Sequence, residues 1–179
     1  MKKVVLITGD LAAGKSTLAD NLSKTTGFTC IKKDSVKEII CDSVGFSTRE
    51  ENRRISVSAV NSMIYFLEQT LKVGREIILE ANFRLSEILK IKELVEQHQS
   101  KLFIIYLTGD TEVLYKRFLS RVPTRHRAHL SIGLDKDYQK FVDYINELRK
   151  QLERIDYLKI DTTSLLEQDI LTHVLSYIN

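Results

Sequence analysis

One stretch near the N-terminus decides the fold: Gly9-Asp10-Leu11-Ala12-Ala13-Gly14-Lys15-Ser16, a complete G-x-x-x-x-G-K-[ST] pattern. An apolar run from Val4 to Ile7 precedes it, and a segment typical of a helix, Ser16 to Lys24, follows it. The pattern is diagnostic only in this strand–loop–helix setting. We therefore expect a loop that binds the phosphates of a nucleoside triphosphate together with magnesium.

The chemistry of such a loop assigns a role to each residue type. Successive backbone N–H groups surround phosphate oxygens, and the N-terminus of the following helix adds partial positive charge. Lys15 can reach the β- and γ-phosphates, and the hydroxyl of Ser16 can bind the metal. The residues expected to contact the nucleotide are Gly9, Asp10, Leu11, Ala12, Ala13, Gly14, Lys15, Ser16 and Thr17.

Length and composition favour one domain spanning residues 1–179. The hydrophobic fraction is 43% and the charged fraction is 28%, which is ordinary for a globular protein. The single proline and the lack of a Gly/Ser-rich stretch argue against a linker. A net charge of +3 does not indicate nucleic acid as an obligate partner, although it does not exclude one. Cys30 and Cys41 have no metal-ligand spacing, so we expect buried or half-buried thiols.

The N-terminal apolar run is too short for a signal peptide, and the phosphate loop interrupts it. No stretch approaches the length that spans a membrane. The sequence thus predicts a cytoplasmic location and no membrane partner. It offers nothing about a protein partner.

Strand-like and helix-like segments alternate along the chain, which predicts a parallel sheet covered by helices on both faces. The expected strands are Lys3–Thr8, Phe28–Ile31, Glu76–Glu80, Lys101–Thr108 and Tyr157–Asp161. The expected helices include 48–72, Leu85–Gln97, 110–120 and an apolar stripe over 138–155. Thr48 with Glu51, and Ser164 with Glu167, have the spacing of capping boxes that open helices.

In sheets of this kind, ligands bind beyond the carboxyl ends of the strands. Asp34, Glu80 and Asp161 follow or end three of the expected strands, so they should lie at the same edge as the phosphate loop. Asp34 could accept a proton from a substrate hydroxyl in phosphoryl transfer. Equally, the segment could be a helix start in which Ser35 and Glu38 form a capping box.

Glu80 could bind the metal or its waters, or it could bind the substrate. Its being glutamate rather than aspartate makes direct metal contact less certain, and a solvated strand-end carboxylate is a third reading. Arg84 follows shortly and could line the same pocket, or it could be an ordinary surface charge.

The densest basic stretch runs from Lys116 to His129. Arg117 and Arg121 share a helix face, and Pro123 should end that helix before Arg125. Next to a phosphate loop we interpret residues of about 121–136 as a lid that excludes water; a solvated basic loop or a nucleic-acid patch is the alternative. His126 and His129 lack further ligands and are interpreted as lid residues rather than as a metal site. The turn containing Thr162 could contact adenine, or it could be a plain strand-to-helix turn.

Taken in order, these motifs resemble small P-loop kinases. The resemblance is to the group that contains zeta toxins, chloramphenicol phosphotransferase and polynucleotide 5′-kinase domains, and to its AAA-type uncharacterised ATPases. The stretch Arg121 to His129 is similar to the Arg…Arg-His-x-Gly-His lid of that group, with Ala128 in place of glycine. No separate Walker B strand ending in aspartate is evident, which leaves the second metal ligand open.

The resemblance implies a three-layer fold like that of nucleoside-monophosphate kinases, with sheet order 2-3-1-4-5. It implies that Asp34 is the base, that Arg117 lies near adenine, and that Arg121 and Arg125 bind phosphate. Lys15, Asp34, Arg121 and Arg125 are then the expected catalytic residues, and Asp34, Glu80 and Arg84 the expected substrate residues. The helices from Asp34 to Lys72 would form the substrate side.

Three functions remain open on the sequence. The first is an ATP-dependent kinase acting on a hydroxyl of an unidentified small molecule. The second is a polynucleotide 5′-kinase or a toxin-type nucleotide-sugar kinase. The third is a nucleotide-binding switch module without transfer activity.

Overall fold

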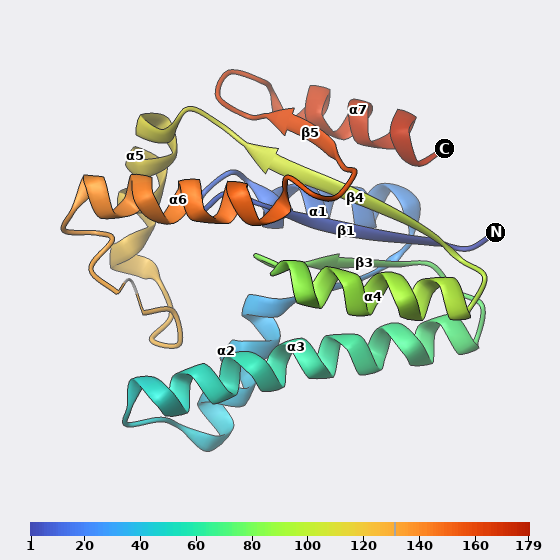
Figure 1. Cartoon of the computed structure of the whole chain (residues 1–179), viewed down its shortest axis with the longest axis horizontal. Helices are drawn as coiled ribbons and strands as arrows, with labels where there is room; N and C mark the ends of the chain where they lie inside the picture. Colours follow the sequence, from blue (N-terminus) through green and yellow to red (C-terminus); the bar gives the residue numbers. More distant parts are fainter. Residues whose placement is uncertain (131) are drawn as a thin grey trace.

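A five-stranded parallel sheet forms the centre of the computed structural model, which describes residues 1–130 and 132–179. The strand order is β2-β3-β1-β4-β5, which confirms the predicted order (Figure 1). The strands are β1 (Lys3–Gly9), β2 (Thr29–Lys32), β3 (Ile77–Glu80), β4 (Lys101–Thr108) and β5 (Leu158–Asp161). Each bound lies within one residue of its prediction.

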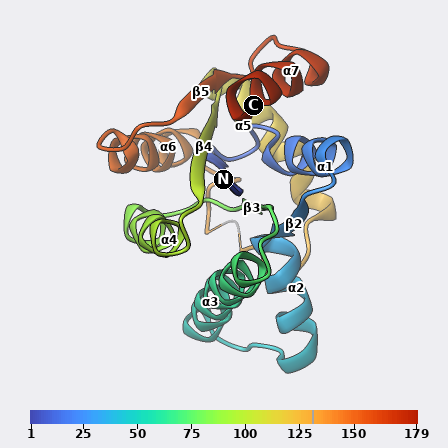
Figure 2. The same ribbon diagram turned by 90° about the vertical axis from the view of Figure 1, so that its right-hand side faces the viewer.

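Helices cover both faces of this sheet, with α1 and α7 on one side and α4 and α6 on the other (Figure 2). The pair α2 and α3 packs together beside the β2 edge. The helices are α1 (Lys15–Thr26), α2 (Lys33–Val44), α3 (Arg49–Lys72), α4 (Leu85–Gln97), α5 (Thr111–Arg121), α6 (Tyr138–Leu152) and α7 (Glu167–Ile178). A short 3₁₀ turn, Val122–Thr124, follows α5 at the predicted Pro123 stop.

Strand β1 divides the core into two clusters because its side chains alternate between the two faces. Val5 and Ile7 pack with α1 and α7, whereas Val4 and Leu6 pack with α3 and α4. All four side chains are fully buried. Burial on both faces explains why the strand is a continuous apolar run rather than an alternating one.

Of the capping boxes expected from the sequence, the one at Thr48 is present. The Thr48 hydroxyl accepts from the Glu51 N–H at 3.1 Å, and the Glu51 carboxylate accepts from the Thr48 N–H. The box expected at Ser164 is wrong, since α7 begins at Glu167 with Leu166 as its N-cap. There the Asp161 carboxylate accepts hydrogen bonds from Thr163, which holds the preceding residues in a turn.

The alternative considered for the segment that contains Asp34, a capping box at Ser35 and Glu38, is not present. Helix α2 begins at Lys33, and its N-cap, Lys32, is still extended and makes no side-chain cap. Asp34 and Ser35 therefore lie in the first helical turn, where a carboxylate interacts favourably with the helix dipole. This position frees the Asp34 side chain from a capping role.

Cys41 is buried and Cys30 is half-buried, as expected, and both are free thiols. Within the described ranges, no helix combines the length and the apolar character that crossing a membrane requires. The predicted lid of about 121–136 includes Ser131, which lies outside the described residues.

Gly9 provides a test of the loop's packing against β4. Its φ is +129°, and a Cβ there would lie 2.0 Å from the Leu107 carbonyl oxygen. We expect Gly9→Ala to lower the free energy of unfolding by about 3 kcal/mol, because both strain and a backbone clash result. Urea unfolding of the variant and the wild type measures this loss in the free energy of unfolding.

Gly27→Ala is the matched control, since Gly27 also has a positive φ, +75°, but has open space around it. It should cost only about 1 kcal/mol. Equal losses in the two variants would contradict the close approach of Gly9 to β4.

Candidate functional site

The phosphate-loop sequence connects β1 to α1 at the carboxyl edge of the sheet. Gly14 precedes α1 with φ +86°, a conformation that glycine adopts without strain. The loop residues Leu11 to Ser16 line a cavity of about 160 Å³. We call this the donor cavity.

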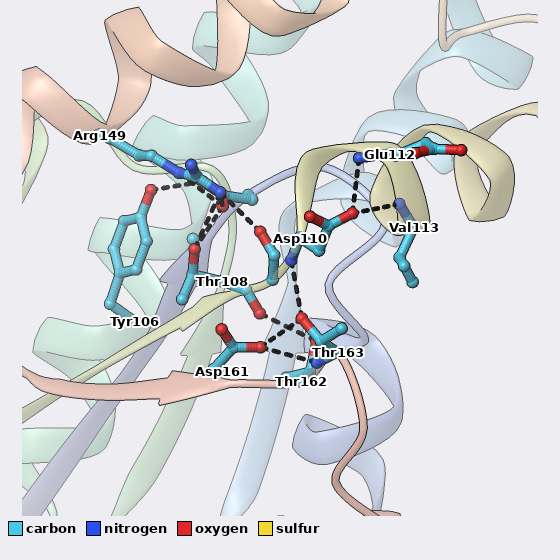
Figure 3. A network of polar contacts seen from close by, with 12 residues as sticks. Tyr106, Thr108, Asp110, Glu112, Val113, Arg149, Asp161, Thr162 and Thr163 are labelled. Atoms are coloured by element: carbon cyan, nitrogen blue, oxygen red, sulfur yellow. Dashed lines mark hydrogen bonds and ion pairs between the residues drawn. The ribbon is translucent and has the colours of Figure 1, made fainter.

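Asp10, the second loop residue, does not line this cavity. Its carboxylate is fully buried beneath the loop and accepts hydrogen bonds from the Tyr106 hydroxyl at 2.6 Å and the Thr108 hydroxyl at 2.7 Å. The Arg149 guanidinium of α6 donates to the same carboxylate at 2.6 and 3.0 Å, and also to the Gly109 carbonyl (Figure 3). The backbone N–H of Asp10 donates to the Leu107 carbonyl at 2.8 Å. These contacts fix the loop to β4 and α6.

Tyr106, Thr108 and Arg149 are not among the site residues expected from the sequence. Burial, together with the hydrogen bond to Asp10, raises the pKa of the Tyr106 hydroxyl, which therefore stays a donor. The charge of Asp10 in the loop is a signal that a partner cation exists. The sequence around the loop does not indicate that this cation is Arg149.

Lys15 is buried and turns back over the loop. Its ammonium donates to the carbonyl oxygens of Asp10 at 2.6 Å and Gly9 at 3.2 Å. Burial lowers its pKa, which the nearby carboxylates of Glu80 and Asp34 partly oppose. The Lys15 ammonium therefore lies near acidic groups on the wall of the donor cavity, where a bound phosphate could also accept its hydrogen bonds.

Ser16 and Glu80 also come together on the wall of this cavity. The Ser16 hydroxyl donates to the Glu80 carboxylate at 3.2 Å, although β3 and α1 are far apart in sequence. Glu80 is buried, and this burial raises the pKa of its carboxyl group, with Lys15 acting in the opposite direction. A hydroxyl and a carboxylate side by side offer the hard oxygen ligands that Mg²⁺ prefers.

Asp34 also lines the donor cavity, in the first turn of α2, with its side chain largely exposed. Its carboxylate lies 3.8 Å from Nδ1 of His129, whose Nε2 is 2.7 Å from the Glu38 carboxylate. His129, which is almost buried, thus joins the 126–129 segment to α2. Its role as a lid residue stays a prediction.

Hydrogen bonds from α2 and α3 hold the backbone of the segment 126–129. The Ala128 carbonyl accepts from the Lys37 ammonium at 2.7 Å and from the Asn52 amide at 3.0 Å, and Ala128 is fully buried. His126 lies 3.1 Å from the Asp42 carboxylate. The described part of the segment is therefore packed against α2 and α3.

The other arginines predicted for the site fall at three places. Arg121 and Arg125 line the donor cavity, and the Arg125 guanidinium lies 5.2 Å from the centre of the Phe118 ring. Arg117 donates to the Thr162 carbonyl at 3.0 Å, next to a cavity of about 330 Å³ that Thr17 also lines. Arg84 lies away from the donor cavity, on a neighbouring one.

That neighbouring cavity, which we call the acceptor cavity, has a volume of about 790 Å³ and lies between α2, α3 and the start of α4. It meets the donor cavity along a shared wall. The residues on both cavities are Leu11, Lys33, Asp34, Asn82, Phe118 and Arg125. Space for a second ligand is therefore continuous with the phosphate loop.

Residues 5–132 of the chain match a family model described as an AAA domain. No curated protein matches the sequence significantly. Among solved structures, a proposed kinase from Chloroflexus aurantiacus is 24% identical, with a TM-score of 0.80 and 99% of each chain covered.

Two more distant structures have the same fold. A gluconokinase from Sinorhizobium meliloti is 14% identical, with a TM-score of 0.65, covering 98% of this chain and 91% of that one. The APS kinase from Mycobacterium tuberculosis, in complex with AMPPNP and APS, is 14% identical with a TM-score of 0.66, covering 98% and 96%. At these identities the likeness establishes the fold.

The ion pair between Arg149 and Asp10 is testable by a double-mutant cycle. Arg149→Gln should lower the free energy of unfolding by about 3 kcal/mol, because it leaves a buried carboxylate without its cation. Asp10→Asn combined with Arg149→Gln should cost clearly less than the sum of the two single changes, as measured by urea unfolding. Additive losses would show that the pair does not stabilise the loop.

The raised pKa of Glu80 leads us to expect that replacing this residue increases stability in a pH-dependent way. Because its pKa is raised in the folded state, the fold loses stability as pH rises from the ordinary glutamate range through the raised value. Glu80→Gln should therefore unfold about 2–4 °C higher at pH 8, a gain of about 1 kcal/mol, and show no gain near pH 4.

The control for this change is Glu76→Gln, just before the other end of β3, which should shift stability by less than about 0.5 kcal/mol at either pH. A Glu80→Gln protein that is less stable than the wild type at pH 8 would contradict the burial argument.

Proposed function

We propose that this chain, which belongs to the AAA domain family, is an ATP-dependent kinase that phosphorylates a hydroxyl group of a small molecule. The observation that carries the proposal is the wall shared by the donor and acceptor cavities. Asp34 lies on that wall, so one carboxylate can face both a γ-phosphate and an incoming hydroxyl.

On this proposal the triphosphate binds along the loop from Leu11 to Ser16, with backbone N–H groups and the N-terminus of α1 around it. Lys15 exchanges its carbonyl partners for phosphate oxygens. Ser16 and Glu80 are the residues that would hold Mg²⁺, and the ion supplies neutralisation of phosphate charge. Adenine occupies the cavity beside Arg117 and Thr162.

The transfer step follows from the position of Asp34. As the acceptor oxygen forms a bond to the γ-phosphorus, the bond from that phosphorus to the bridging β,γ-oxygen breaks, and ADP leaves. Asp34 takes the proton of the hydroxyl. Arg121 and Arg125 offset the charge on the transferred group. The segment 126–129, held on α2 by His129, limits the access of water.

Substitutions of Asp34 and Lys15 test their roles in phosphoryl transfer. Asp34→Asn should retain ATP affinity and lower phosphoryl transfer by about 10²–10⁴-fold, the usual contribution of a general base. Lys15→Ala should lower transfer by at least about 100-fold through lost charge stabilisation. Transfer by each variant is measured by incubation with γ-labelled ATP, Mg²⁺ and a cell metabolite extract, followed by identification of labelled products.

Asp20→Asn is the control for charge, since Asp20 pairs with Lys32 and lines neither the donor nor the acceptor cavity. It should transfer phosphate as the wild type does. Transfer that is intact in Asp34→Asn would overturn the assignment of the base. Nucleotide binding with no labelled product would favour a switch module, and label on an oligonucleotide end would favour a polynucleotide 5′-kinase.

A further inference from the structure

The wall of the acceptor cavity carries more positive than negative charge. Its cationic residues, apart from His129, are Lys33, Lys37, Arg49, Arg53, Arg84 and Arg125, and its carboxylates are those of Asp34, Glu50 and Glu87. Six cationic and three acidic side chains leave an excess of three positive charges. The whole chain has a net charge of only +3, so this wall concentrates cations in one place.

Each of the three carboxylates already has a partner. Glu50 pairs with Arg54 at 3.6 Å, and Glu87 accepts from the backbone N–H of Arg84 at 2.8 Å. Asp34 lies beside His129. None of the three forms an ion pair with a lysine or arginine of the cavity wall.

Most of the cations, by contrast, have no acidic partner. Lys37 donates to Asn52 and to the Ala128 carbonyl, which makes it a structural tie. The others form no ion pair with any residue in the described ranges: Lys33, Arg49, Arg53, Arg84 and Arg125. Since proteins usually pair or disperse such charges, five unpaired cations on one concave surface favour an anionic ligand.

The backbone adds to this positive field. Helices α2, α3 and α4 all begin at the cavity, as Lys33, Arg49 and the α4 N-cap Arg84 belong to its wall. The N-terminus of a helix carries partial positive charge. Arg49 and Arg53 are four residues apart and so project from one face of α3, where two guanidinium groups can bind one anion.

A separate feature of the wall is suited to a hydroxyl. The side-chain oxygen of Asn82 is buried and has no hydrogen-bond partner among the described residues. Asn82 lies on the boundary between the donor and acceptor cavities, as Asp34 does. A buried acceptor without a partner is costly, and a donor hydroxyl on a ligand would satisfy it.

We propose that the phosphoryl acceptor is a small anionic molecule, with a phosphate or carboxylate group bound by Arg49, Arg53 and Arg84 and its hydroxyl bound at Asn82 and Asp34. This inference rests on the proposed kinase function. A cavity of about 790 Å³ suits a metabolite-sized ligand rather than a polymer. A neutral acceptor would displace water from the cations and leave them unsolvated.

The test fractionates the acceptor pool by charge and size. A cell metabolite extract is ultrafiltered, and the low-mass part is divided on an anion-exchange resin at neutral pH. Each fraction is incubated with the wild-type protein, γ-labelled ATP and Mg²⁺. Label should appear in the low-mass anionic fraction and not in the neutral or cationic fraction. Prior treatment with alkaline phosphatase, then removed, distinguishes the sources: label lost indicates a phosphate ester, and label retained indicates a carboxylate.

Two variants test whether arginines of the cavity wall bind the anionic group of the acceptor. Arg53→Gln should lower kcat/KM for the anionic fraction about tenfold or more, mainly through KM, with ATP affinity unchanged. Arg75→Gln removes one positive charge from an exposed arginine outside the cavity and should change kcat/KM less than twofold.

The outcomes separate this inference from the kinase proposal. Label in the neutral fraction, or in the high-mass nucleic-acid fraction, would contradict the small anionic acceptor while leaving phosphoryl transfer intact. Equal effects of Arg53→Gln and Arg75→Gln would contradict the assignment of the anion to α3. ATP binding with no labelled product from the unfractionated extract would contradict the kinase proposal, and the inference with it.

Discussion

A fully buried carboxylate holds the site together. Asp10 begins the turn from β1 into the phosphate loop, and its charge is tolerated there only because Arg149, Tyr106 and Thr108 all donate to it. A buried charge that loses its partners destabilises a protein by several kcal/mol. The position of the loop therefore depends on β4 and on α6, although α6 follows the loop by more than 120 residues in the chain. Loop, sheet edge and α6 are fixed relative to one another by this one interaction.

This constraint gives the two cavities their relation. Because the loop cannot shift away from β4, the donor cavity opens toward β3 and the start of α2, where Glu80 and Asp34 lie. The acceptor cavity continues from that point between α2, α3 and α4. The shared wall lies beside the phosphate loop because parallel strands deliver their carboxyl ends to the same edge. The segment 126–129 contacts α2 through His129 and Ala128.

The sequence predicts this fold well because its strands are continuous apolar runs, and their burial on both faces leaves a clear signal. It also predicts the loop, Ser16, Glu80 and Asp34 at one edge. The capping boxes at Ser164 and at Ser35 do not form, because a capping-box spacing is a local pattern. The contact of Asp161 with Thr163 and the extended Lys32 place these helix starts elsewhere. Arg149 was missed since its partner lies 139 positions away, and no periodicity encodes such a pair. The unpaired state of Arg49 and Arg53 likewise depends on tertiary packing.

We propose that one wall of the molecule serves both the donor and the acceptor of a phosphoryl transfer, and a crystal structure with AMPPNP and Mg²⁺ would test this proposal. We expect the γ-phosphate beside Lys15, the ion near Ser16 and Glu80, and the Asp34 carboxylate facing the γ-phosphorus from the acceptor cavity. A γ-phosphate directed away from Asp34, with the acceptor cavity closed off from it, would overturn the proposal.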